Sequence, residues 1–395
     1  MNSKLISQNY GSPLSRNRFS PIKNLRPETI TRCLDAFNAG RLSQAAMLFE
    51  AIAQRDDTIC CLNAKRKKSV SRLEYEICPL ENSRKARAHQ RALAQFYEEL
   101  EASSATECNA SGGVRRLVSQ MMDCAAMKYS VHKMEFRRDG GSLKGKFIQY
   151  PLWLFENTSG RLRILKNENQ LTDGEDLDES QWLIACGDGL MIPSAVAYIF
   201  KSLPMRDWLA YCERNGMPGI KAKTNAFPNS PQWESAKDAV SQFGAEFFAV
   251  LSEGTDIDAI DVSSKGQLPY REIIERTDRM LCALWRGSDL STLSGANQIG
   301  ASAQWYESTI IEEDDAANIG ETLNRRVDAK VIEILFGEDK PLAKFRLKLP
   351  DYEEKQWELD MIERLAKLGL KPDEVQLARK FAFPVKEESG DDEIQ

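Results

Sequence analysis

Apolar residues in this chain recur mostly every three or four positions, which is the spacing of a helix with one buried face. The first such helix opens at Pro27, whose missing N–H costs nothing in a first turn, and it stops near Gly40. Ser43 is predicted to cap a second helix. Three more helices are expected at about 57–72, 84–100 and 114–129.

Alternation of apolar and polar residues marks the predicted strands. Leu73, Tyr75 and Ile77 alternate with polar neighbours as far as Pro79, which is typical of a half-buried strand. The small polar residues of 101–113 predict a linker or a mobile loop. Further strand-like stretches cover 131–138, 146–155, 160–166 and 181–186. This part of the chain is therefore expected to be α+β.

The second half is predicted to be mainly helical. A helix over 193–214 should kink at Pro204. A strongly amphipathic helix starts at Pro269 and breaks at Gly287. The other expected elements are a helix at 231–242, strands at 247–251 and 257–262, a glycine-rich break at 287–300, a long helix at 301–336, a strand at 345–349 and helices at 352–368 and 372–380.

Composition and charge narrow the class of protein. Hydrophobic residues make up 42% and charged residues 28% of the 395 positions, as in globular proteins with enough chain for two or three cores. Acids outnumber bases by 59 to 53, which argues against a tight nucleic-acid binder but not against DNA that passes loosely by. No apolar run reaches about 18 residues, so no membrane span is expected. The polar N-terminal segment lacks the apolar core of a secretory signal.

Cysteine and histidine usage predicts no metal centre and no catalytic nucleophile. The nine cysteines are scattered without a CxxC pair, which favours reduced, buried thiols in a cytosolic compartment. His89 lies on a charged helix and is expected to be solvated, whereas His132 alternates with strand residues and should lie on a strand face. Neither histidine has a partner at ligand spacing. We therefore expect no enzymatic activity, no cofactor and no bound metal.

Three further motifs are better explained by structure than by function. Cys186-Gly187-Asp188-Gly189 lacks the third glycine and the lysine of a phosphate-binding loop, so it is interpreted as a turn before a helix. The acidic clusters at 173–179, 256–261 and 312–315 lack the spacing of a calcium loop. The basic run at 65–68 lies at a helix C-terminus, where cations suit the helix dipole. A contact with a phosphate or a partner is the alternative for that run.

Four stretches, taken in order, resemble the Mu-like phage portal family. The family has similar opening helices with an Ala-Gly break, an Arg-Asp-Trp helix that ends in Gly-Met-Pro, and a C-terminal helix-turn-helix. The matching stretches are 26–79, MRDWLAYCERNGMP at 205–218, 294–303 with Thr322-Leu323-Asn324 and Leu335-Phe336-Gly337 downstream, and LGLKPDEVQLARKFAFP at 368–384. One departure is the sequence from Trp285 to Leu290, which replaces the apolar Leu-Gly-Gln-Thr-Leu-Thr run that the family usually has before its glycine-rich loop.

The resemblance implies an α+β portal fold with a wing, a two-helix stem, a clip insertion, a tunnel loop and a helical crown. The implied parts are a flexible tail at 1–26, a wing at 27–190, stem helices within 191–286 with the clip inserted at about 219–266, a tunnel loop at 287–300, a long helix at 301–340 that completes the wing, a crown at 341–384 and an acidic, disordered tail at 385–395.

The resemblance also implies a function and a set of partners. Portal subunits form a closed, head-to-tail ring, generally of twelve, at one capsid vertex of the virion. The ring would assemble in the host cytoplasm with major capsid and scaffold proteins, and it would pass double-stranded DNA during packaging and ejection. It would dock the terminase large subunit and later the head-completion or neck proteins. The alternatives are a phage minor head or scaffold-type interaction protein without a channel, and a small-ligand enzyme of unrecognised type.

The implied tunnel loop is the candidate functional site. A channel must hold DNA centred without gripping it, and short polar side chains can form short-lived hydrogen bonds to phosphates that read no sequence. Glycines would let the loop flex as the duplex passes. The candidate DNA-facing residues are Ser288, Ser291, Thr292, Ser294, Asn297 and Gln298, and the candidate hinges are Gly287, Gly295 and Gly300. The alternative is an ordinary loop between two helices.

Overall fold

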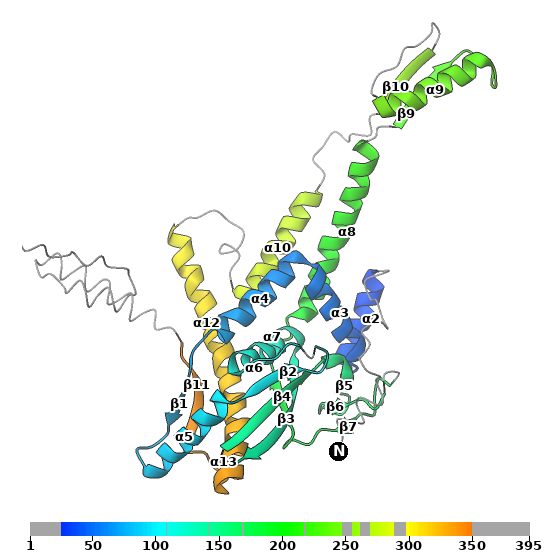
Figure 1. Cartoon of the computed structure of the whole chain (residues 1–395). Coiled ribbons are helices and arrows are strands. Elements are labelled where there is room, and N and C mark those ends of the chain that lie inside the picture. The colour runs from blue at the N-terminus through cyan, green and yellow to red at the C-terminus, as the bar shows by residue number, and fades with distance from the viewer. Residues whose placement is uncertain are drawn as a thin grey trace, which may run out of the picture. The chain divides into compact units, whose positions relative to one another are not determined.

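The computed structural model describes residues 25–107, 109–140, 142–167, 170–216, 219–246, 255–260, 269–287 and 298–349 (Figure 1). Residues 1–347 form one unit, and 348–395 form another. Of the second unit, the described residues are Lys348 and Leu349. The predicted N-terminal tail, the two last helices and the acidic C-terminal tail therefore lie outside the described residues, except that Leu25 and Arg26 are described.

Three helices open the described chain, α2 (Pro27–Asn38), α3 (Ser43–Arg55) and α4 (Asp57–Ser71). As predicted, the chain turns after α2 at Gly40, which has a left-handed backbone and lies too close to the backbone of Asn157 for a side chain. The prediction that Ser43 caps α3 is wrong, because Ser43 is the buried first residue of the helix and Leu42 occupies the cap position. Asp56 does cap α4, by accepting a hydrogen bond from its first turn.

The largest sheet has four strands in the order β2-β4-β3-β8. They are β2 (Glu101–Ser104), β3 (Tyr129–Asp139), β4 (Ser142–Tyr150) and β8 (Trp182–Cys186). β2 pairs with β4 in parallel, and the other pairs are antiparallel. The prediction of a loop at 101–113 is therefore wrong for its first residues. Ala102 and Ser103 are buried, because the backbone of β4 supplies hydrogen bonds that do not depend on side-chain type.

A second, two-stranded sheet joins distant parts of the chain. β1 (Tyr75–Pro79) pairs antiparallel with β11 (Ala343–Leu347), with Tyr75 opposite Leu347. α5 (Arg84–Glu98) packs on both of these strands and on β4. The expected helix at 114–129 is two helices, α6 (Val114–Met121) and α7 (Asp123–Met127). The remaining short elements are η1 (Leu152–Leu154), β5 (Phe155–Glu156), β6 (Arg163–Ile164) and β7 (Glu175–Asp176).

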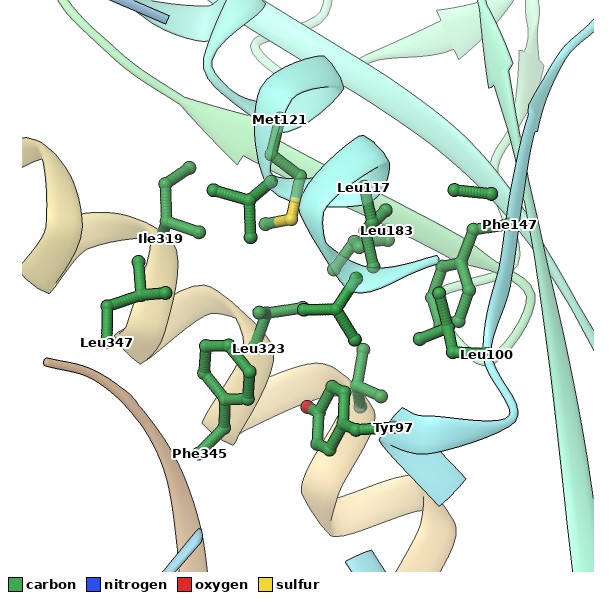
Figure 2. Packing of buried hydrophobic residues seen from close by; sticks show 14 of the residues in the cluster. Tyr97, Leu100, Leu117, Met121, Phe147, Leu183, Ile319, Leu323, Phe345 and Leu347 are labelled. Atoms are coloured by element: carbon green, nitrogen blue, oxygen red, sulfur yellow. The ribbon is translucent and has the colours of Figure 1, made fainter. Parts of the chain in front are cut away.

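The long helix after the glycine-rich break packs into the first of two hydrophobic cores. It consists of α12 (Gln298–Leu323), a π-helical segment η2 (Asn324–Asp328) and α13 (Ala329–Phe336). Ile319 and Leu323 of this helix lie among Tyr97, Leu117 and Phe345, as Figure 2 shows. The side chains that form this core thus come from sequence positions more than two hundred residues apart, so α5 and α6 fold together with the long helix.

The second core holds the helices that lie on either side of an insertion. α8 (Met191–Gly216) contains Pro204, and α10 (Tyr270–Arg286) packs along it. Met191 and Ala195 of α8 are buried with Leu281 and Trp285 of α10. No helix in the described part of the chain is both long enough and apolar enough to span a membrane.

The insertion between α8 and α10 contains β9 (Gly219–Thr224), α9 (Pro231–Glu246) and β10 (Thr255–Ile260). The predicted helix and the second predicted strand are present. β10, however, pairs antiparallel with β9, with Thr255 opposite Thr224. The predicted strand at 247–251 lies outside the described residues. Sequence alternation did not identify β9 because Gly219-Ile220-Lys221-Ala222-Lys223-Thr224 has few apolar residues.

Candidate functional site at the base of the 287–300 segment

The described residues include the two ends of the candidate loop. Gly287 ends α10 in a left-handed conformation with φ 73°, and its N–H binds the carbonyl oxygen of Ala283 at 2.8 Å. Gln298 and Gly300 lie in the first turn of α12. The other candidates lie outside the described residues, namely Ser288, Ser291, Thr292, Ser294, Gly295 and Asn297. Several buried polar groups hold α10 and α12, the helices on either side of this segment.

Trp285 fixes the end of α10 against α8. The side chain is 1% exposed, and its Nε1–H donates a hydrogen bond to Oγ of Ser194 at 2.9 Å. The Ser194 hydroxyl in turn donates to the carbonyl oxygen of Leu190 at 2.7 Å. Because a buried indole N–H needs an acceptor, this chain of hydrogen bonds favours one orientation of α10 along α8.

Arg66, in α4, connects the two helices that flank the loop. Its guanidinium donates to both carboxylate oxygens of Asp315 on α12, at 2.7 and 2.9 Å. The same guanidinium lies 3.4 Å from the carbonyl oxygen of Trp285 on α10 and 3.4 Å from Oδ2 of Asp188. The side chains of Arg66 and Asp315 are 8% and 9% exposed. A bidentate pair in such surroundings has one favoured geometry, so it sets the spacing between the end of α10 and α12. We refer to Arg66, Asp188, Ser194, Trp285 and Asp315 as the loop anchor.

Lys201 of α8 joins the other end of α4 to α10. Its Nζ lies 2.8 Å from Oδ1 of Asp57, 2.9 Å from Oδ1 of Asp278 and 3.1 Å from Oδ2 of Asp56. The Lys201 side chain is 6% exposed. α4 is therefore tied to α8 and α10 at its N-terminus and to α10 and α12 further along, so it connects the helices that flank the loop.

Both buried cations keep their charge. Burial alone would lower the pKa of Lys201, but hydrogen bonds with Asp57 and Asp278 outweigh that effect and raise it. The same hydrogen bond with Lys201 lowers the pKa of Asp57. Burial would also lower the pKa of Arg66, and the Asp315 carboxylate raises it above its usual value. Burial also raises the pKa of the Asp315 carboxyl, and the hydrogen bond from Arg66 opposes that effect. Lys201 and Arg66 therefore stay protonated over the physiological pH range.

The basic run at 65–68 is not a uniform surface patch. Arg66 is buried in the loop anchor, and Lys67 pairs with Asp123 at 2.6 Å. Lys65 and Lys68 are exposed. The alternative of a contact with a phosphate or a partner is therefore wrong for Arg66, because its side chain is buried. Lys68 lies in the last turn of α4, where a cation suits the helix dipole.

Of the two histidines, one lies in the environment predicted for it and the other does not. The prediction that His89 is solvated is wrong, since its side chain is fully buried and Nδ1 accepts a hydrogen bond from the N–H of Leu342 at 3.1 Å. His132 lies on β3 as predicted and is also buried, and burial lowers its pKa to about 4. Among the described residues, no group of three His, Cys, Asp or Glu side chains is arranged to hold a metal ion.

The Cys186-Gly187-Asp188-Gly189 motif is a turn before α8, as predicted. Gly189 has a φ of 72°, and a side chain at Gly187 would collide with the backbone of Cys124. The turn brings Asp188 to the guanidinium of Arg66. The motif therefore contributes to the loop anchor and not to a phosphate-binding site.

The sequence analysis did not identify the loop anchor or Lys201. Lys201 is a single cation in the apolar stretch AVAYIFKSL, which is a signal of a buried ion pair. Trp285 follows Leu281 at i+4 and Thr277 at i+8, so its place on the buried face could have been inferred. The partners of Arg66 could not, because Asp315 lies 249 positions away.

Comparison with known proteins identifies the family. A family model described as portal protein of Mu bacteriophage matches residues 46–383. A search of curated proteins gives no match.

Three solved structures are similar to this chain. A chain in the neck of an empty GTA particle, computed with C6 symmetry, has a TM-score of 0.52 and 10% identity, and the match covers 86% of this chain and 94% of that chain. An HK97 family phage portal protein from Corynebacterium diphtheriae has a TM-score of 0.45 and 12% identity, over 75% of this chain and 95% of that chain. A chain in the neck of a native GTA particle, computed with C12 symmetry, has a TM-score of 0.48 and 11% identity. The match covers 89% of this chain and 94% of that chain.

The family match covers most of the chain and includes α8, α10, their insertion and α12. The likeness to the neck chain of the empty GTA particle agrees with it at the level of the fold, which is the α+β portal fold. On the strength of the family match, this chain belongs to the family of Mu bacteriophage portal proteins.

Proposed function

We propose that this chain is the subunit of a homo-oligomeric portal ring at one capsid vertex, through which double-stranded DNA is packaged and later ejected. The observation that carries the proposal is the family match over 46–383. A neck chain of similar fold occurs in a particle computed with C6 symmetry, which supports a ring of copies. A closed ring needs head-to-tail contacts between two different faces of each subunit.

The parts of the chain take the roles of a portal subunit. The stem is α8 and α10, and the clip is the insertion that holds β9, α9 and β10. The wing is the α+β body from 27 to 190, completed by the long helix over 301–340. Support for this assignment comes from α12 and η2, which share a hydrophobic core with α5 and α6. Because β11 pairs with β1, the proposed crown is confined to the part of 341–384 that follows Leu347.

The segment 287–300 acts as the tunnel loop in this proposal. The part free to line a channel is 288–297, since Gln298 and Gly300 lie in α12. Its serine, threonine and asparagine side chains would contact phosphates briefly without adding the cationic grip that slows sliding. The loop anchor supports this role, because Arg66 holds both flanking helices and so fixes where the loop leaves the body.

The partners follow from the same proposal. The ring has twelve subunits, assembles in the host cytoplasm with major capsid and scaffold proteins, and remains at the portal vertex of the virion. The clip docks the terminase large subunit during packaging and the head-completion or neck proteins afterwards. The subunit itself has a structural and not a catalytic role, and a separate terminase ATPase supplies the force.

The direct test is electron microscopy of the purified full-length chain, alone and with its capsid and scaffold proteins. We expect closed rings of about a dozen subunits with an open central channel. A chain that stays monomeric or dimeric under all these conditions would contradict the proposal and favour an interaction protein without a channel. Rings that form but are excluded from capsids would contradict the assignment to the portal vertex.

A further inference from the structure

Helix α5 carries a stripe of arginines that the proposed channel does not use. Arg84, Arg87 and Arg91 follow one another at i, i+3 and i+7, so they share one face of the helix. All three are exposed, whereas His89 and Leu93 are buried. We refer to Arg84, Arg87 and Arg91 as the α5 stripe. α5 itself is held by β1, β11 and α13 (Figure 1).

The charges on α5 oppose the dipole of the helix. A helix N-terminus carries partial positive charge, so acidic residues stabilise the first turn and basic residues the last. α5 has no acidic residue in its first turn and no basic residue in its last turn. Its acid is Glu98, at the C-terminal end. The stripe therefore does not serve the stability of its own helix, and its positive charge points to something outside the chain.

The stripe also lacks counter-charges. Among the described residues, no carboxylate lies within ion-pair distance of Arg84, Arg87 or Arg91. Arg87 donates to the neutral side-chain oxygen of Asn82 at 2.9 Å, and Arg91 donates to the backbone carbonyl of Arg87 at 3.3 Å. Lys85, which is not part of the stripe, pairs with Glu338 at 2.8 Å. Positive charge is thus left uncompensated in a chain whose net charge is −6.

We propose that the α5 stripe binds the phosphate backbone of double-stranded DNA. The choice of DNA rests on the proposed function, which brings the ring into contact with packaged DNA. Arginine suits the task, because its planar guanidinium donates two parallel hydrogen bonds to a phosphate. From Arg84 to Arg91 the helix rises by roughly 10 Å, and a duplex of that length carries about six phosphates.

A duplex fits the stripe better than an acidic protein surface does. The stripe is a line of exposed side chains, so a ligand that offers negative charge at any register along that line suits it best. A phosphate backbone does this, whereas carboxylates on a protein would need a matching geometry. The contact would hold DNA in place, in contrast to a tunnel loop that must let it slide. It would be independent of sequence and strongly weakened by salt.

The test is equilibrium binding of a short fluorescent duplex to the full-length chain, measured by anisotropy from about 50 to 200 mM salt. The test variant combines Arg84→Gln, Arg87→Gln and Arg91→Gln. The matched control removes the same charge from exposed arginines elsewhere, with Arg32→Gln, Arg41→Gln and Arg55→Gln.

We expect the wild type and the control to bind with a steep salt dependence. The stripe variant should bind more weakly, and the slope of log K against log salt should flatten by about 2 to 3 for each stripe that a duplex contacts. Its thermal midpoint should stay level or rise, because the substitutions remove charges that oppose the helix dipole. That readout separates lost binding from lost folding.

Two outcomes would overturn the inference. One is a wild type that shows no binding of duplex at the lowest salt. The other is a stripe variant whose affinity and slope equal those of the control, in which case the arginines serve another partner, such as an acidic protein face. Neither outcome touches ring formation, which electron microscopy reports separately, so this inference and the proposed function can fail independently.

Discussion

The guanidinium of Arg66 donates hydrogen bonds to both carboxylate oxygens of Asp315, at 2.7 and 2.9 Å, although the two residues lie 249 positions apart in the sequence. Arg66 lies in α4, and Asp315 lies in the helix that follows the candidate tunnel loop. The same guanidinium reaches the carbonyl oxygen of Trp285, in the helix that precedes the loop. One side chain therefore controls how far apart the two ends of the loop are held.

Loss of Arg66 should destabilise the fold. In Arg66→Met, Asp315 is left buried without its cation, and removal of one partner of a buried pair costs about 3–5 kcal/mol. The double variant Arg66→Met with Asp315→Leu should recover most of that loss, because no buried charge remains. Urea denaturation followed by circular dichroism measures both. A double variant that is as unstable as the single one would show that the pair does not act as a unit.

Shortening the loop should separate assembly from DNA handling. Deletion of 291–297 leaves the loop anchor and both flanking helices intact, and the free energy of loop closure changes slowly with length. We expect rings to form and to enter capsids, while the amount of packaged or retained DNA falls sharply. Ring counts by electron microscopy and nuclease-protected DNA per capsid are the two measurements. The role as a tunnel loop is contradicted by a deletion that abolishes rings, and equally by one that packages normally.

Two neighbouring residues of α10 should behave in opposite ways. Leu281 is 1% exposed and Met280 is 60% exposed. Leu281→Asp places a charge in the second core and should prevent stable folding. A loss of rings in that variant would therefore reflect unfolding and not a damaged contact between subunits. Met280→Asp should leave the stability of the chain within about 0.5 kcal/mol of the wild type. If the exposed face of α10 lies between subunits, Met280→Asp will still reduce ring formation, as gel filtration can measure. Normal rings from Met280→Asp would exclude that face from the interface.

Asp328 should make stability depend on pH. Its carboxylate accepts hydrogen bonds from the hydroxyl of Tyr97 at 2.7 Å and from the N–H of Phe345 at 2.8 Å. Burial nevertheless raises the pKa of Asp328 from 3.8 to about 6, against the opposing effect of these bonds. Between these two pH values the folded chain holds a proton that the unfolded chain has released. The contribution of Asp328 to the free energy of unfolding therefore rises as pH falls from about 6 to about 4.

Comparison with Asp328→Asn isolates this contribution. A pKa difference of about two units corresponds to roughly 3 kcal/mol. The wild type should therefore gain up to that amount relative to the variant as pH is lowered from neutral to about 4. Asp339→Asn, at an exposed position, is the control for the loss of one carboxylate. A difference between wild type and Asp328→Asn that does not change with pH would mean that Asp328 titrates alike in both states.

Local patterns in the sequence determined most of the helices. Helical spacing and end signals predicted α2, α5, α10 and the long helix after the glycine-rich break, because these elements bury one face and leave the other to water. Alternation predicted β1 and β3 for the same reason, with a period of two. The order of four short motifs also implied the family, and the family match over 46–383 confirms it.

The tertiary structure alone decided which polar groups are buried together. β2 formed from Glu101-Ala102-Ser103-Ser104 because the edge of β4 was free to pair with it. His89 could be buried because the backbone N–H of Leu342, far along the chain, donates a hydrogen bond to its Nδ1. In the basic run at 65–68, Arg66 became buried against Asp315 of the long helix and Lys67 paired with Asp123 of α7, while Lys65 and Lys68 stayed exposed. Periodicity reports how a segment faces water, whereas an ion pair such as Arg66 with Asp315 depends on two segments that meet only after the whole chain has folded.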